Sequence, residues 1–147
     1  MFEKDFIQSK GKPIQYQDKT IYMIDYFEVP NKQCKININF VTTDSEWKQG
    51  IALTVKGNFV INNQKIKKDI RLWEHTAPKN ISFEVESTDK KIMVTNIWDT
   101  GDSVTQKWHN GGALYFEEIE NGKRYYCNDG HSNDDFNDII FELTIVK

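Results

Sequence analysis

The heptapeptide KININFV (residues 35–41) decides the fold class of this 147-residue chain. Ile36, Ile38 and Phe40 occupy alternate positions, and two asparagines stand between them. Since successive side chains of a β-strand point to opposite faces of a sheet, this alternation predicts a strand with one apolar and one polar face. Such a strand is typical of an antiparallel sheet that covers a hydrophobic core with one side.

The same period-two pattern recurs on both sides of this stretch. Asn62-Asn63 and Asn121-Gly122 separate neighbouring strand-like runs and predict tight hairpins, because these residues tolerate positive φ. In all, the pattern predicts about nine strands, at residues 20–29, 35–41, 51–61, 64–73, 81–86, 92–99, 113–119, 123–128 and 139–146.

Helical signals are almost absent. Only residues 44–50 have the composition of a helical turn, with Asp44 or Ser45 as its cap and Gly50 as its end. No linker or repeat divides the chain, so a single domain over residues 1–147 is expected. The expected fold is all-β: an antiparallel two-sheet sandwich of the jelly-roll type, with little or no helix.

Composition excludes two classes of partner. The net charge of −3 and the isoelectric point near 5.6 provide no basic face for nucleic acid. The apolar runs are too short to span a membrane.

The first residues do not form a secretory signal, which favours a cytoplasmic location or release by another route. Cys34 and Cys127 are expected to be buried free thiols, or one disulfide if the protein is exported.

Residues 128–138, NDGHSNDDFND, form an acidic connection between two predicted strands. The segment contains four aspartates and no Lys or Arg. Like charges this close repel one another, and solvent, neighbouring cations or a bound metal relieve the repulsion. Calcium binds carboxylate, amide and backbone carbonyl oxygens, all of which the segment offers. The candidate Ca²⁺ ligands are Asp129, Asn133, Asp134, Asp135, Asn137 and Asp138.

The order of residues within this segment supports a shared site. Asn133, Asp135 and Asn137 are alternate residues that can lie on one side of the backbone, while Phe136 is expected to point into the core. The segment is not an EF-hand, since Asp138 stands where that loop requires Gly and no flanking helices are predicted.

The stretch from Asn133 to Ile140, NDDFNDII, resembles the Asp-x-Asp-aromatic-Asn-Asp-apolar motif of small bacterial calcium-dependent lectins of the fucose-binding type. A similar motif occurs in some exported bacterial β-sandwich domains. In the lectins it holds two adjacent calcium ions that coordinate sugar hydroxyls. The resemblance implies Asp135, Asn137 and Asp138 as ligands and a carbohydrate as partner, although Asn133 stands where the family has Asp.

A metal-free interpretation of the acidic segment stays open. Asp and Asn side chains often accept hydrogen bonds from backbone amides in loops, and this segment precedes the final predicted strand. In that case its oxygens would cap the main chain and would not converge on an ion.

A second polar and aromatic cluster consists of Trp98, Asp99, Trp108, His109 and Asn110. Aromatic rings beside Asp and Asn suit sugar binding, because a ring contacts the C–H groups of a pyranose and the polar groups bind its hydroxyls. The alternative is that the tryptophans belong to the core.

The chain contains no GxSxG, HExxH, GxxxxGKS or GxGxxG motif, so no reaction is indicated. The expected function is a non-enzymatic calcium-binding β-sandwich, which the lectin resemblance extends to carbohydrate binding. The alternative is a protein-interaction domain, such as an immunity or assembly component, whose acidic loop meets a basic partner without metal.

Overall fold

The computed structural model describes residues 2–107, 112–130 and 135–147. These residues form one helix and twelve strands, so the expectation of a mostly antiparallel β protein is confirmed. The elements are α1 (Phe2–Gln8), β1 (Ile14–Tyr16), β2 (Lys19–Ile21), β3 (Asp25–Glu28), β4 (Gln33–Thr43), β5 (Lys48–Ile61), β6 (Gln64–Trp73), β7 (Asn80–Ser87), β8 (Lys91–Asp99), β9 (Thr105–Gln106), β10 (Ala113–Ile119), β11 (Gly122–Asn128) and β12 (Ile139–Val146).

All nine predicted strand segments contain strands, and the segment at residues 20–29 divides into β2 and β3. The two hairpins are confirmed: β5 pairs with β6, β10 pairs with β11, and Asn62, Asn63 and Asn121 have φ of 51°, 64° and 64°. The predicted helical turn at residues 44–50 is wrong. Gln49 and Gly50 are buried residues of β5, so the pairing of that strand overrides the local helical signal.

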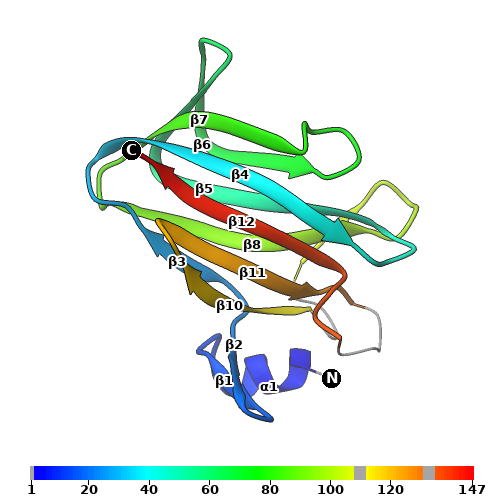
Figure 1. Ribbon diagram of the computed structural model, residues 1–147. Coiled ribbons are helices and arrows are strands. Elements are labelled where there is room, and N and C mark those ends of the chain that lie inside the picture. The colour runs from blue at the N-terminus through cyan, green and yellow to red at the C-terminus, as the bar shows by residue number, and fades with distance from the viewer. Residues whose placement is uncertain (1, 108–111, 131–134) are drawn as a thin grey trace.

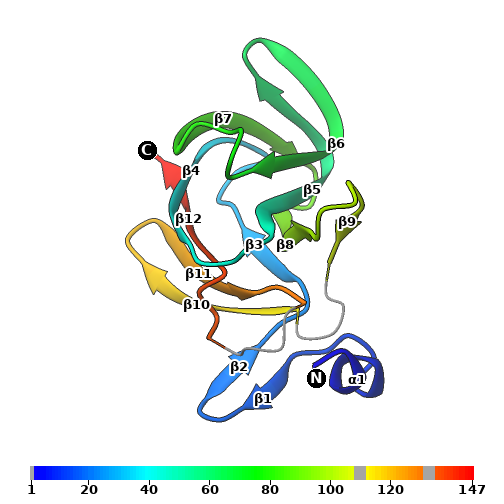
Figure 2. The ribbon, with the colours of Figure 1, turned by 90° about the vertical axis from the view of Figure 1, so that its right-hand side faces the viewer.

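Ten strands form one large sheet, in the order β10-β11-β12-β4-β7-β5-β8-β3, with β6 paired to β5 and β9 to β8. Residues 48–54 of β5 pair with β8, while residues 57–60 pair with β7. Because one long strand serves both neighbours, the sheet curls around its apolar face (Figures 1 and 2). The two-sheet jelly-roll arrangement is not confirmed, since these strands belong to one continuous curled sheet.

The curl brings the two ends of the sheet together. Tyr22, just before β3, exchanges two backbone hydrogen bonds with Leu114 of β10, at 2.7 and 2.9 Å. Next to this bridge, Asp25 of β3 accepts hydrogen bonds on Oδ2 from Lys123 Nζ at 2.9 Å and Tyr125 OH at 2.7 Å, both from β11. Asp25, Lys123 and Tyr125, here called the closing triad, therefore join the first strand of the large sheet to its other end.

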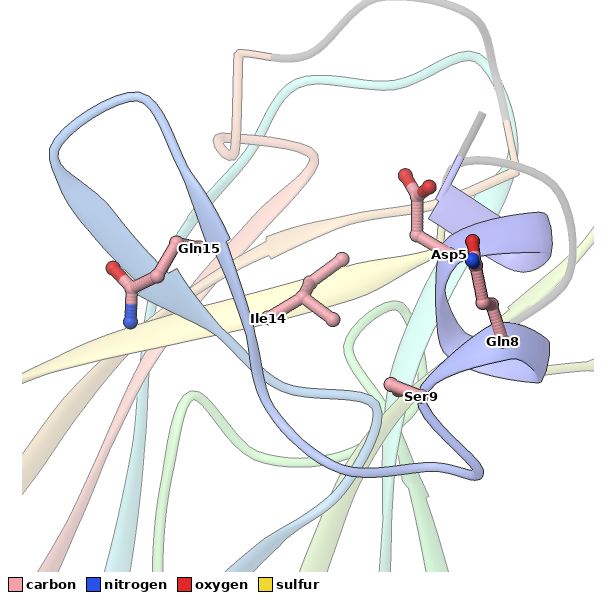
Figure 3. Close-up of a pocket in the computed structure, with 5 residues that line it drawn as sticks. All are labelled: Asp5, Gln8, Ser9, Ile14 and Gln15. Carbon is pink, nitrogen blue, oxygen red and sulfur yellow. The ribbon is translucent and has the colours of Figure 1, made fainter.

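Residues 2–21, here called the N-terminal unit, comprise α1 and the separate two-stranded sheet β1-β2. The unit lies beside β10, at one end of the curled sheet (Figures 1 and 2). Between α1 and β1 is an open hollow of about 350 Å³ (Figure 3). Its lining residues are Asp5, Gln8, Ser9, Ile14 and Gln15.

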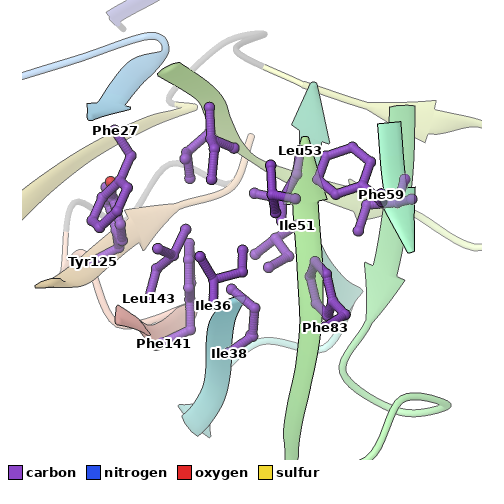
Figure 4. Packing of buried hydrophobic residues seen from close by; sticks show 14 of the residues in the cluster. Phe27, Ile36, Ile38, Ile51, Leu53, Phe59, Phe83, Tyr125, Phe141 and Leu143 are labelled. Atoms are coloured by element: carbon purple, nitrogen blue, oxygen red, sulfur yellow. The ribbon is translucent and has the colours of Figure 1, made fainter. Parts of the chain in front are cut away.

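The main core fills the inside of the curled sheet with aliphatic and aromatic side chains (Figure 4). The side chains that alternate in the sequence point inward, as Ile36 and Ile38 of β4 show. Burial of this apolar surface is the main force that holds the strands in register. Cys34 and Cys127 are free thiols, and burial raises the pKa of both.

Candidate functional site

The acidic segment joins β11 to β12 and meets the connection between β4 and β5. These two connections lie at the same edge because β12 pairs with β4. The backbone N–H of Asp44 donates to the carbonyl of Asp138 at 3.1 Å, which ties them together. Two chain segments more than eighty residues apart in sequence thus build one site.

A pair of buried aspartates forms the centre of this site. Asp129 and Asp138 are 0% and 1% exposed. Asp129 Oδ2 accepts hydrogen bonds from Ser45 Oγ at 2.6 Å and from Gln49 Nε2 at 2.9 Å. Asp138 Oδ2 accepts one from the backbone N–H of Asp129 at 2.9 Å, and the two carboxyl groups are also hydrogen-bonded to each other.

Burial of the carboxyl group is the largest of the effects that together raise the pKa of Asp138 to about 7. The neighbouring charges of Asp129 and Asp135 and the hydrogen bond to the Asp129 carboxyl contribute to this rise, while the backbone N–H of Asp129 opposes it. Near neutral pH the pair therefore binds a proton readily, which is the electrostatic behaviour of a site that favours positive charge.

Two buried amide oxygens in this region have no hydrogen-bond partner among the described residues. They are Oε1 of Gln49, a residue only 3% exposed, and Oδ1 of Asn137. Gln49 Nε2 is engaged by Asp129 and by the carbonyl of Trp47, and Asn137 Nδ2 donates to Asp44 Oδ2 at 3.4 Å. Since amide oxygens are strong acceptors, two unsatisfied ones in a single acidic site are unusual.

The backbone of the segment is held in an uncommon conformation at Phe136, whose φ is +55°. For an aromatic residue this left-handed geometry costs about 1–2 kcal/mol, so surrounding contacts must impose it. The backbone N–H of Phe136 donates to Asn128 Oδ1 at 2.8 Å. The ring is buried as expected, but in a small second cluster and not in the main core. That cluster comprises Phe2, Phe6, Ile21, Ala113 and Phe136.

The structure brings some of the candidate ligands together and separates others. Asp129 and Asp138 are in contact, and Asn137 lies beside Asp138 in the chain with one unsatisfied oxygen. Asp135 is exposed at the margin of the site. Asn133 and Asp134 lie outside the described residues. Ser45 and Gln49, which the sequence did not single out, contribute directly.

Hydrogen bonds of the kind expected for a metal-free loop are also present. Asn128 Oδ1 caps the backbone N–H of Phe136, and Asp138 Oδ2 caps that of Asp129. Such caps fix the segment, but they satisfy neither of the two amide oxygens of Gln49 and Asn137.

Glycine at position 130 allows the segment to approach the sheet. A Cβ there would lie 3.1 Å from Cζ2 of Trp98, so a larger residue would push the backbone away from the indole. Trp98 itself is 1% exposed and offers no open ring face to a ligand.

The second candidate cluster is only partly described. Asp99 Oδ1 accepts backbone hydrogen bonds from Gly101 at 2.8 Å and from Ser103 at 3.1 Å, so it organises the turn after β8. Trp108, His109 and Asn110 lie outside the described residues.

The one helix in the described part of the chain is too short and too polar to cross a membrane. No group of three or more His, Cys, Asp or Glu side chains there is arranged to hold a metal. Among the described residues, a metal at the pair would need oxygen donors of other types, and the amide oxygens of Gln49 and Asn137 are of that kind.

Comparison of the chain with protein-family models, with curated proteins and with solved structures finds no match.

Proposed function

We propose that the connection between β11 and β12 binds a calcium ion at the pair Asp129 and Asp138. The observation that carries the proposal is the close approach of two buried aspartates, in which Asp138 Oδ2 accepts a hydrogen bond from the backbone N–H of Asp129 at 2.9 Å. Two desolvated negative charges side by side are strongly unfavourable unless a proton or a cation compensates them. Because the pKa of Asp138 is about 7, the proton leaves slightly above neutral pH, and a cation can then replace it.

The donor set suits a hard cation. Asp129 and Asp138 supply charge, and Gln49 and Asn137 each supply a neutral amide oxygen that lacks a donor among the described residues. A carboxylate can accept about four hydrogen bonds or metal contacts in total, so the bonds from Ser45 and Gln49 do not preclude a bound ion. Calcium accepts mixed oxygen ligands in irregular geometry, whereas magnesium demands a near-ideal octahedron.

The proposal concerns the cation alone. Carbohydrate binding stays a prediction of the lectin resemblance, and binding of a basic protein partner stays the alternative. Calcium binding and calcium-dependent carbohydrate binding both require a calcium response from the isolated protein, whereas binding of a basic partner without metal requires none.

Isothermal titration of the chelator-treated full chain with Ca²⁺ at pH 7.5 tests the proposal. A site with two carboxylates and neutral oxygens should have a Kd on the order of 10⁻⁴ M. At calcium concentrations well above Kd, the melting temperature should rise, because the ion binds only the folded state. Absence of both heat and thermal shift at 5 mM Ca²⁺, roughly fifty times that Kd, would contradict calcium binding.

Two variants assign the binding to the pair. Asp129→Asn and Asp138→Asn each remove one charge and keep the shape of the side chain, so each should abolish the calcium response. Asp18→Asn is the matched control, because the Asp18 side chain is 92% exposed in the β1-β2 hairpin. A calcium response that survives in both pair variants would place the ion elsewhere.

A further inference from the structure

Phe136 belongs to two parts of the molecule at once. In sequence it stands between Asp135 and Asn137, two residues before Asp138, and its backbone is fixed by Asn128. In space its ring packs against Phe2 of α1 and Tyr16 of β1, with ring centroids 5.9 and 6.2 Å apart. A change in the position of this one residue therefore reaches both the acidic pair and the N-terminal unit.

The attachment of α1 depends on this cluster. Phe2 and Phe6 are the buried residues of the helix, and both belong to the second cluster with Phe136. The open hollow of about 350 Å³ between α1 and β1 shows that the helix does not pack closely along the neighbouring hairpin (Figure 3). A seven-residue helix is also not stable by itself in water, so it needs these tertiary contacts.

We infer that occupation of the cation site controls how firmly the N-terminal unit is docked, with Phe136 as the link; this inference rests on the proposed calcium binding. An ion held by Asp129, Asn137 and Asp138 fixes the backbone on the C-terminal side of Phe136. The left-handed conformation of Phe136 is then retained, and its ring stays available to Phe2 and Phe6. Without the ion, these added contacts are lost and the same backbone is held less firmly.

Coupling of this kind is reciprocal. If calcium tightens the docking of α1 by a given factor, docking of α1 tightens calcium binding by the same factor. Couplings between sites in proteins are commonly about fivefold or more. Loss of the aromatic contacts of α1 should therefore weaken calcium binding at least about fivefold, although α1 supplies none of the proposed ligands.

Hydrogen exchange of the full chain tests whether calcium tightens the docking of the N-terminal unit. Mass spectrometry compares peptides from residues 2–16 in EDTA and in 5 mM Ca²⁺ at pH 7.5. We expect exchange in these peptides to slow at least about fivefold with calcium. Peptides from β7, which lies in the middle of the large sheet, should change little and serve as the internal control.

Titration of variants with Ca²⁺ tests the reciprocal effect, in which docking of α1 tightens calcium binding. The double variant Phe2→Ala, Phe6→Ala should bind Ca²⁺ at least about fivefold more weakly than the natural sequence. Ile7→Ala is the matched control, because Ile7 is on the same helix and is 63% exposed. Both aromatic residues lie outside the main core, and a cooperative thermal transition verifies that the double variant is folded.

The outcomes separate this inference from the proposed function. Calcium binding by the natural sequence, with unchanged exchange at residues 2–16 and an unchanged Kd in the double variant, overturns the inference and leaves the calcium site intact. Absence of calcium binding overturns both and is seen in the titration of the natural sequence alone. If the double variant fails to fold, the exchange comparison, which needs no variant, decides the matter.

Discussion

The closing triad and the acidic pair are two solutions to the same physical problem, a buried aspartate. At the triad, Asp25 lies 2.9 Å from Lys123 Nζ and 2.7 Å from Tyr125 OH, and the side chains of Asp25 and Lys123 are 7% and 15% exposed. At the pair, Asp138 meets another carboxyl group and a backbone amide. Lys123 thus supplies the counter-charge in the first region, whereas the contacts of Asp138 with the described residues include no cationic side chain.

The largest effect is expected from breaking the triad. Lys123→Met keeps an apolar stem but removes the ammonium group that lies over the Phe116 ring and leaves Asp25 buried without this cation, which should reduce the free energy of unfolding by about 3–5 kcal/mol. Urea denaturation at pH 7.5 measures this loss. Lys65→Met is the control, since Lys65 is 62% exposed in its ion pair with Glu86 and should cost less than about 1 kcal/mol. Equal losses of unfolding free energy in the two variants would contradict the role of Lys123 as the buried counter-charge of Asp25.

Replacement of Asp by Asn should have opposite effects on the free energy of unfolding in the two regions. Asp138→Asn removes a charge that burial and the neighbouring carboxyl groups make unfavourable, so in EDTA at pH 8 it should raise the free energy of unfolding by about 1–3 kcal/mol, given about 1.4 kcal/mol per pKa unit. Asp25→Asn removes the counter-charge of Lys123 and should destabilise the fold. Urea denaturation of both variants measures the two signs. Destabilisation by both would show that Asp138 is charged and well compensated without an ion.

The acidic pair should also make stability depend on pH. Since the folded-state pKa of Asp138, about 7, lies above its ordinary value of 3.8, the protonated form stabilises the native state. This contribution is complete below about pH 4 and is lost as the pH rises through 7. In EDTA, the free energy of unfolding should fall by about 2 kcal/mol between pH 5 and 8.

Calcium should oppose the fall in the free energy of unfolding at high pH, because the ion and the proton compete for the same carboxyl groups. The calcium-induced rise in melting temperature should therefore be larger at pH 8 than at pH 5.5. Calorimetry at the two pH values measures the difference, and Asp138→Asn should abolish it. A calcium effect independent of pH would argue that the ion binds away from Asp138.

The smallest effect is expected at an ion pair that is close but exposed. Arg124 donates to Glu142 Oε2 at 2.8 and 2.6 Å across β11 and β12, and its side chain is 39% exposed. Arg124→Ala should cost less than about 1 kcal/mol, and 1 M NaCl should reduce the difference further. A cost near that of Lys123→Met would show that proximity, and not burial, sets the strength of these pairs.

The strands could be predicted because their signal is local. Ile36, Ile38 and Phe40 alternate within one segment, and the structure places all three in the main core. Helix α1 could not be predicted in the same way, since seven residues with buried Phe2 and Phe6 carry too little periodicity and depend on tertiary contacts. The curl of the sheet follows from the change of partner along β5, for which the sequence offers no clear mark.

The candidate site was predictable only in part, for a related reason. The aspartates of the acidic segment cluster in sequence, so Asp129 and Asp138 could be nominated directly. Ser45 and Gln49 lie 84 and 80 residues from Asp129, and they reach it only because β12 pairs with β4. Gln49 is a polar residue next to the predicted strand at residues 51–61, and this position is the one sequence feature that points to it. The local composition of residues 44–50 predicts a helical turn there, which hides its place in β5.

Closure of the large sheet sets a condition on how the molecule folds. The contacts of Asp25 with Lys123 and Tyr125 span 98 and 100 residues of chain, and Tyr22 bridges to Leu114. Contacts this remote slow the folding of β proteins to milliseconds or seconds, because a long loop must be ordered before they form. During synthesis, Asp25 of β3 must therefore wait for these two side-chain partners until β11 has left the ribosome.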